Sequence, residues 1–302
     1  MGLRPMTVAT LLTANIAYGF TDMDRLASSV RHQLQIHGWG ALSYVMFPSL
    51  RGSPAKLSAT KRTAYVLKHR NLGPTLEMIE QARADVVVLN EVIYELHRAE
   101  LESALVQIGF QGIAWGVSTH YPGTSISTLV ASKEPGTAIR CVMPQRPSMG
   151  GGAGMAGLRL LRTSRTIFGV HLTYRSPALF ERQLDYIAQV AADEYARGRE
   201  VIIGGDWNDS VSAIVKNPKF RSLNLVPASL TENATCPTFF PHFLRKPLDH
   251  IFIPCHWRGI TSNTIAFGSD HLALAVEVRP GSSAQVAKPV SAGAAMLDDQ
   301  GD

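Results

Sequence analysis

A carboxylate and an amide stand two residues apart behind a short apolar run, and this is the sequence's clearest chemical signal. Residues 201–203 are Val-Ile-Ile, two glycines follow, and Asp206 and Asn208 come next. Side chains at i and i+2 of an extended chain point to the same side, so we expect both to face one pocket and hold a water or a phosphate oxygen. An Asx turn after the strand is the alternative structural explanation.

Polar residues of the same kind stand at or beside the ends of other apolar strands. They combine hard oxygen ligands with two histidines, and in chain order they are Asn15, Glu91, His171, Asp206, Asn208, Asp249, Asp270 and His271. The loops at one rim of a two-sheet sandwich would bring such residues together. Their composition is typical of a magnesium-assisted phosphoester site.

The elements that must position these residues follow from apolar patterning and turn signals. Apolar runs predict strands near 7–17, 85–91, 112–116, 125–132, 138–142, 157–161, 166–172, 201–203, 248–253 and 272–278. Helical spacing predicts helices from Thr21, over 74–82, over 95–108 and from Ser176 to about 197. The glycine-rich 150–154 segment lacks a following helix and is interpreted as a hairpin connection.

Composition bounds the protein class. The chain has 302 residues, 45% hydrophobic and 18% charged, which is ordinary for a globular protein. Its apolar stretches are too short and interrupted for a transmembrane segment, and the apolar start is interpreted as a buried strand rather than a signal peptide. Three cysteines without C-x-x-C spacing indicate reduced buried thiols in a cytoplasmic protein.

Basic charge is concentrated in one segment. The chain carries a formal net charge of +5, while residues 20–75 contain eight Lys or Arg against two Asp. Trp39, Tyr44 and Phe47 lie in the same segment. A solvated surface loop, a nucleic-acid contact and an anionic lipid contact all suit this mixture.

The ordered set of motifs resembles the endonuclease/exonuclease/phosphatase superfamily, the deoxyribonuclease-I-like fold. The matching motifs are Asn15, Leu89-Asn90-Glu91-Val92, Val170-His171-Leu172 with Arg182-Gln183, Gly205-Asp206-Trp207-Asn208, Leu248-Asp249-His250-Ile251-Phe252 and Ser269-Asp270-His271. The resemblance implies an α/β fold, a four-layer α/β/β/α sandwich with two mainly antiparallel sheets. It also implies one catalytic domain over 1–279 with a basic insert around 20–72, followed by a disordered tail over 280–302.

The resemblance further implies a metal site. Glu91 would bind Mg²⁺, or Mn²⁺ in its place, with Asn15 and Asp270 beside it. Two departures from the family pattern concern this region. Position 90 is Asn where the family commonly has Gln, and position 17 is Ala where some nuclease members carry an acidic residue, which argues against a second metal position.

The same resemblance implies the catalytic roles. His271, oriented by Asp249, would act as general base or stabilise charge on the phosphate. Asp206 would position the attacking water and Asn208 would hold a phosphate oxygen. His171 would stabilise the pentacovalent transition state or assist the leaving group. His250 and Trp207 are interpreted as structural neighbours.

The predicted function is metal-dependent hydrolysis of a phosphodiester, with DNA or RNA as the favoured substrate. The first alternative is a phospholipid or inositol-phosphate phosphoesterase that docks on anionic lipid, because the basic aromatic segment suits both partners. The second is a catalytically inactive binding module of the same fold. We expect a monomer.

Overall fold

The computed structural model describes residues 9–16, 71–117, 126–144, 154–173, 176–229, 235–237, 245–267, 269 and 271–281. Five parts of the sequence interpretation therefore lie outside the described residues: the helix expected from Thr21, almost all of the basic insert with its aromatic residues, the glycine-rich 150–154 segment except Gly154, Asp270, and the tail beyond residue 281.

The first sheet has six strands in the order β13-β14-β1-β2-β4-β3. Its strands are β13 (Arg258–Ile265), β14 (Ala273–Arg279), β1 (Ala9–Asn15), β2 (Val86–Ile93), β4 (Ile126–Ser132) and β3 (Gly112–Val117). Strands β1 and β2 pair in parallel, and the other neighbours are antiparallel.

The second sheet also has six strands, in the order β5-β6-β7-β8-β12-β9. They are β5 (Gly136–Ile139), β6 (Gly154–Leu160), β7 (Arg165–His171), β8 (Glu200–Asp206), β12 (Asp249–Pro254) and β9 (Leu225–Pro227). Here β7 and β8 are the parallel pair. A small separate pair joins β10 (Cys236–Pro237) to β11 (Arg245–Lys246).

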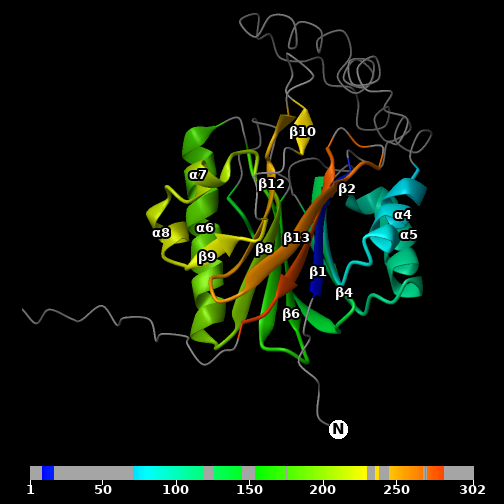
Figure 1. Ribbon diagram of the computed structural model, residues 1–302, viewed down its shortest axis with the longest axis horizontal. Coiled ribbons are helices and arrows are strands. Elements are labelled where there is room, and N and C mark those ends of the chain that lie inside the picture. Colours follow the sequence, from blue (N-terminus) through cyan, green and yellow to red (C-terminus); the bar gives the residue numbers. More distant parts are fainter. Residues whose placement is uncertain are drawn as a thin grey trace, which may run out of the picture.

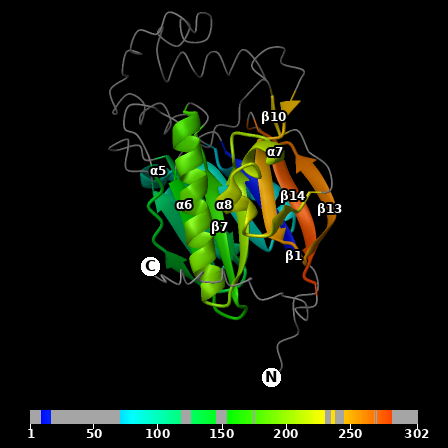
Figure 2. The same ribbon diagram turned by 90° about the vertical axis from the view of Figure 1, so that its left-hand side faces the viewer.

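The two sheets pack face to face, and helices cover both outer faces (Figures 1 and 2). Helices α4 (Gly73–Gln81) and α5 (Tyr94–Gln107) lie on the first sheet. Helices α6 (Pro177–Ala196), α7 (Val211–Ile214) and α8 (Pro218–Arg221) lie on the second. These four layers confirm the predicted fold, with one parallel pair inside each mainly antiparallel sheet.

Side-chain alternation along the strands explains the layers. On β1, Leu11 joins the core between the sheets and Leu12 the core under α4 and α5. On β8, Ile202 faces the other sheet and Ile203 faces α6. A strand buried on both faces is apolar throughout rather than alternating, which is why these runs were recognisable. Each such buried side chain contributes about 1.5–3 kcal/mol.

Capping residues mark both ends of helix α6. The Ser176 side chain accepts a hydrogen bond from the Leu179 N–H at 3.3 Å, and Pro177 occupies the first turn, where its missing N–H costs nothing. Gly198, at φ 72°, follows the last turn in a left-handed conformation. The helix runs along the strands of the second sheet and returns the chain from the end of β7 to the start of β8 (Figure 2).

Three expectations need correction. Strand β2 does not end at Glu91 but continues to Ile93 through a shift of register. Strand β5 covers Gly136–Ile139 rather than 138–142. Cys255 is exposed and Cys141 is only partly buried, so the prediction of buried thiols is wrong for both. Cys255 lies in the turn directly after β12, where the chain leaves the core.

The two sheets approach each other closely near the rim where β7 ends at His171 and β8 ends at Asp206. A Cβ atom added at Gly169 of β7 would lie 2.7 Å from Val130 Cγ2 and 2.9 Å from Thr128 Cγ2 of the first sheet. Within the second sheet, a Cβ added at Gly205 of β8, where φ is 147°, would lie 1.9 Å from the carbonyl oxygen of Val170 on neighbouring β7. Glycine is therefore required at both positions.

No helix among the described residues is both long and apolar enough to cross a membrane.

Candidate catalytic centre

Three strands of the second sheet end or begin at the same level of this rim. His171 closes β7 and is in register with Asp206, which closes β8. Asp249 opens β12 and stands opposite Asp206 in the antiparallel pairing. All three side chains are buried, with at most 6% of their surface exposed. The strand ends thus bring two carboxylates and an imidazole together from distant parts of the chain.

The first sheet brings polar groups to the same rim. Asn15 ends β1 in register with Asn90 of β2, and its amide Nδ2 donates to Asp206 Oδ2 at 3.1 Å. Ser269 Oγ donates to the Asn15 carbonyl at 2.6 Å and accepts from the His271 N–H at 3.2 Å. Ser269 therefore holds the turn before β14 against the end of β1, which places His271.

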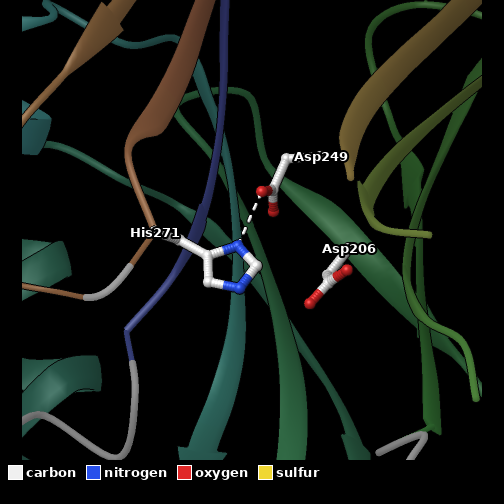
Figure 3. A group of neighbouring side chains, drawn as sticks. All are labelled: Asp206, Asp249 and His271. Atoms are coloured by element: carbon white, nitrogen blue, oxygen red, sulfur yellow. Dashed lines mark hydrogen bonds and ion pairs between the residues drawn. The ribbon is translucent and has the colours of Figure 1, made fainter. Parts of the chain in front are cut away.

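His271 and Asp249 form a hydrogen-bonded pair across the two sheets. The His271 Nδ1 lies 2.8 Å from Asp249 Oδ2. Figure 3 shows the imidazole turned toward Asp249, with Asp206 across the gap from the ring. The backbone N–H of Asp249 donates to Thr235 Oγ1 at 3.2 Å, which fastens the strand end. A carboxylate on Nδ1 favours the tautomer that presents Nε2 to a reacting atom.

Burial controls the electrostatics of this group. Burial raises the pKa of Asp249, and the neighbouring His271 works against that rise. Burial lowers the pKa of His171, although Asp206 works in the opposite direction with its Oδ2 3.7 Å from His171 Nε2. His171 is therefore neutral at neutral pH. Its Nδ1 has no hydrogen-bond partner among the described residues.

Asp206 and Asn208 are joined by a turn rather than by an extended chain. Asn208 has φ 55°, and its N–H donates to Asp206 Oδ1 at 3.0 Å. Its side-chain Nδ2 donates to the Leu172 carbonyl at 2.8 Å. The expectation of two parallel i, i+2 side chains is therefore wrong, because an Asx turn reverses the chain here. The turn still keeps both residues at the rim beside β7.

Trp207 anchors this turn from below. Its side chain is fully buried, its Nε1 donates to the His250 carbonyl at 3.0 Å, and its ring packs edge-on against Phe220 and Phe252. His250 Nε2 lies 2.9 Å from the Asp209 carbonyl. Trp207 and His250 thus hold the segment that carries Asp206 and Asn208, in keeping with their structural interpretation.

Glu91 occupies a β-bulge. The pairing of β2 with β4 shifts by one residue between Leu89 and Val92, and Glu91 has φ 56°. The extra residue interrupts the alternation of side chains, so Glu91 is not forced onto the face opposite Asn90. Glu91 is half-buried.

The donor set fits a hard divalent cation. Among the described residues, Asp206, Asp249 and His271 form a group whose ligand atoms lie within 4.8 Å of one another. Glu91, the carboxylate predicted for metal binding, is outside this group, and Asp270 is not described. Within the described part, neither Asp206 nor Asp249 forms an ion pair with Lys or Arg. Buried carboxylate oxygens without a basic partner suit Mg²⁺ or Mn²⁺.

Two buried amides support the rim and were not assigned roles from the sequence. Gln183 Oε1 accepts from the Thr173 N–H at 2.9 Å, and its Nε2 donates to the Pro144 carbonyl at 2.9 Å, which ties the chain after His171 to the second sheet's edge segment. Asn90 contacts the main chain of β8. Both stand inside recognisable motifs, but their partners are far away in sequence. Arg182, beside Gln183, is exposed.

Comparisons with known proteins concern the family and the fold of this chain. The profile of the Endonuclease/Exonuclease/phosphatase family matches residues 68–271. No curated protein matches the sequence. Among solved structures, an endonuclease/exonuclease/phosphatase from Beutenbergia cavernae DSM 12333 is similar at TM-score 0.58 and 16% identity, covering 91% of this chain and 72% of that one.

Two further similar structures hold nucleotide-like molecules. ANGEL2, a 2′,3′-cyclic phosphatase in complex with adenosine-2′,3′-vanadate, matches at TM-score 0.58 and 13% identity over 90% of this chain and 96% of that one. TDP2 of D. rerio, complexed with a single-strand DNA product, matches at TM-score 0.55 and 14% identity over 90% and 99%. At these identities the likeness concerns the fold.

Proposed function

The chain belongs to the Endonuclease/Exonuclease/phosphatase family, and on this premise we propose that it is a metal-dependent phosphodiester hydrolase that uses an activated water. The observation that carries the proposal is the His271–Asp249 pair, with its 2.8 Å hydrogen bond, facing Asp206 across the rim. A histidine that is hydrogen-bonded to one carboxylate and lies beside a second one can accept or donate a proton at a reacting phosphate.

The roles of the residues follow from their surroundings. Asp206 is fixed by amide donors on both carboxylate oxygens, Asn15 on Oδ2 and Asn208 on Oδ1, and it accepts a hydrogen bond from the attacking water. His271 presents its outer nitrogen to the phosphate, as base or as stabiliser of charge, while Asp249 holds the inner one. Asn208, placed at the rim by the Asx turn, would hold a phosphate oxygen.

We assign to His171 the role of stabilising the transition state. Because burial lowers its pKa, it stays neutral and acts as a hydrogen-bond partner of the developing phosphorane or of the leaving group. Glu91, with Asn15 and Asp270, would hold Mg²⁺ or Mn²⁺, and a cation bound there supplies Lewis-acid neutralisation of the phosphoryl oxygens.

Nucleic acid is the proposed substrate class. Two observations support it: the positive net charge of +5 suits a polyanion, and the similar TDP2 structure holds a single-strand DNA product. The concentration of basic and aromatic residues within 20–75 keeps a phospholipid or inositol phosphate as the second candidate. The converging buried carboxylates and histidines disfavour an inactive binding module, because a scaffold has no physical need for them. A cytoplasmic monomer with one catalytic domain over 1–279 completes the proposal.

A substrate panel tests this function. Purified protein is incubated with supercoiled plasmid, single-stranded DNA and RNA oligonucleotides, a phosphomonoester, and phosphoinositide-containing vesicles, each with Mg²⁺ or with a chelator. We expect Mg²⁺-dependent cleavage of a nucleic acid that is lost in the Asp206→Ala variant. Release of a lipid headgroup without nucleic-acid cleavage would instead favour the second candidate, and equal turnover by Asp206→Ala would contradict the mechanism.

A further inference from the structure

Asn90 makes hydrogen bonds across the gap between the two sheets. It is fully buried on β2, one residue before Glu91. With its amide oriented to satisfy both polar atoms, its oxygen accepts from the Asp206 N–H at 2.8 Å. Its nitrogen donates to the Val170 carbonyl at 3.1 Å and to Thr128 Oγ1 at 3.0 Å. One side chain of the first sheet therefore binds the main chain of both β7 and β8.

These bonds complete a cage of three asparagines around Asp206. Asn90 holds the backbone N–H, Asn15 donates to Oδ2 at 3.1 Å, and Asn208 donates its N–H to Oδ1 at 3.0 Å. Two of the three come from the first sheet. A carboxylate held at its main chain and at both oxygens has little freedom to move, which is the requirement for placing a water accurately.

The bulge connects this cage to the predicted metal ligand. Asn90 and Glu91 are consecutive residues at the shift of register in β2. Because Asn90 is fixed to β7 and β8, the bulge that aims Glu91 is fixed to Asp206 as well. The side chain of Asn90 thereby sets the spacing between the two halves of the site, one half on each sheet.

The close approach of the sheets explains why a side chain as short as Asn reaches its partners. Gly169 of β7 leaves no room for a Cβ against Val130 and Thr128 of the first sheet. An Asn amide, one methylene shorter than the Gln that the family commonly carries at this position, therefore spans the gap.

We propose that Asn90 is a positioning residue for hydrolysis, acting through Asp206. This inference rests on the proposed function. It predicts that loss of the amide lowers kcat and leaves KM almost unchanged, because Asn90 is fully buried and its amide bonds go to other residues of the protein. Misplacement of a reacting group by about 1 Å costs roughly 100-fold in rate.

The test compares Asn90→Ala and Asn90→Gln with Thr13→Val as the matched control. Thr13 is also fully buried, on neighbouring β1, and its hydroxyl has no hydrogen-bond partner among the described residues. Using the substrate found in the panel, we expect Asn90→Ala to lose about 100-fold in kcat with KM within about threefold. Asn90→Gln keeps the amide oxygen and the amide nitrogen and should recover about tenfold of that loss. Thr13→Val should match the wild type.

A second measurement separates positioning from folding. The double variant Asn90→Ala/Asp206→Ala should be no slower than Asp206→Ala alone, since Asn90 acts through that carboxylate. Losses that multiply would overturn the inference, and so would a folded Asn90→Ala protein with wild-type kcat. If Asn90→Ala does not fold, Thr128→Val removes one partner of the amide and should lower kcat by about threefold to tenfold; an unchanged kcat there would also overturn it. A wild type inactive on the whole panel would contradict the proposed function itself.

Discussion

The parallel strands β7 and β8 carry opposite chemistry at their two ends. At the start, Arg165 is in register with Glu200, and its Nε lies 3.1 Å from Glu200 Oε2. At the finish, His171 is in register with Asp206, with 3.7 Å between Nε2 and Oδ2. The starting end of this pair of strands therefore carries the Arg165–Glu200 ion pair, and the finishing end carries the His171–Asp206 contact.

The starting end is neutralised within the protein. Glu200 accepts from Trp257 Nε1 at 3.1 Å and lies 2.7 Å from His256 Nε2, and the Arg165 guanidinium stacks on Trp257 with 4.5 Å to the ring centroid. Nearby, Glu194 accepts from Arg159 at 2.6 Å. Each carboxylate has cationic and neutral donors, so the cluster needs nothing from outside.

The finishing end lacks this internal neutralisation. Asp206 and Asp249 contact amides and histidines but no described Lys or Arg. Burial accordingly raises the pKa of Asp249, whereas the pKa of Glu194 is lowered by its hydrogen bond from Arg159. The comparison teaches that one end is satisfied within the protein, whereas the other leaves its carboxylates to the cation and the phosphate of the proposed function.

The largest expected effect is on catalysis at the finishing end. Asp206→Asn removes the charge but keeps the shape, and we expect kcat to fall by at least about 1,000-fold because the water loses its acceptor. Stability should change little, because the substitution removes a buried charge but leaves one acceptor oxygen for the Asn15 and Asn208 donors. Steady-state kinetics and urea denaturation measure the two. A clear loss of stability with normal kcat would show that Asp206 is structural rather than catalytic.

Asp249→Asn should have the next largest effect. The amide no longer fixes the His271 tautomer, so we expect kcat to fall by about 100-fold while KM changes little. Chemical rescue by added imidazole in a His271→Gly protein serves as the companion test of the same pair. Wild-type turnover in Asp249→Asn would show that the pair is structural.

Glu200→Gln should act in the opposite way. The change leaves the Arg165 charge without its partner at the starting end, so we expect the free energy of unfolding to fall by about 2 kcal/mol. At a temperature well below the unfolding transition, kcat should stay within about twofold, because Asp206 at the far end of the same strand is unaffected. If kcat fell as much as in Asp249→Asn, the two ends would be coupled.

The smallest effect concerns the pH dependence of stability. Glu194 and Glu200 have lowered pKa values in the folded state, so their contribution is present above the usual value near about 4.3 and is lost as pH falls through the lowered value. Asp249, with a raised pKa, has the opposite sign: its contribution is present below the usual value of about 3.9 and is lost as pH rises through the raised one.

Denaturation at a series of pH values tests these signs. The deficit of Glu200→Gln should shrink toward acid pH, by about 1 kcal/mol between pH 7 and 3, whereas any advantage of Asp249→Asn should grow toward neutral pH. Parallel curves for both variants would contradict the assigned pKa directions.

Much of the fold followed from local patterns. Strands β2, β7 and β8 are buried on both faces, so their apolar runs marked them in the sequence, and the Ser-Pro start located α6. The bulge at Glu91 was missed, because a Glu residue does not signal a positive φ, whereas the turn at Asn208 is the alternative that Asp and Asn readily form. The exposure of Cys255 was missed for a related reason: it depends on where the chain leaves the core.

By itself, the sequence determined which residue types could carry chemistry and that most of them lie at or beside strand ends, because residue type and hydropathy are local properties. Only the tertiary structure decided which of them meet: His271 with Asp249, Asn15 with Asp206, and Asn90 with the main chain of β8. Those contacts join residues from opposite sheets, up to 191 positions apart. Their geometry depends on how closely the two sheets pack, as at Gly169 against Val130 and Thr128, which no local pattern encodes.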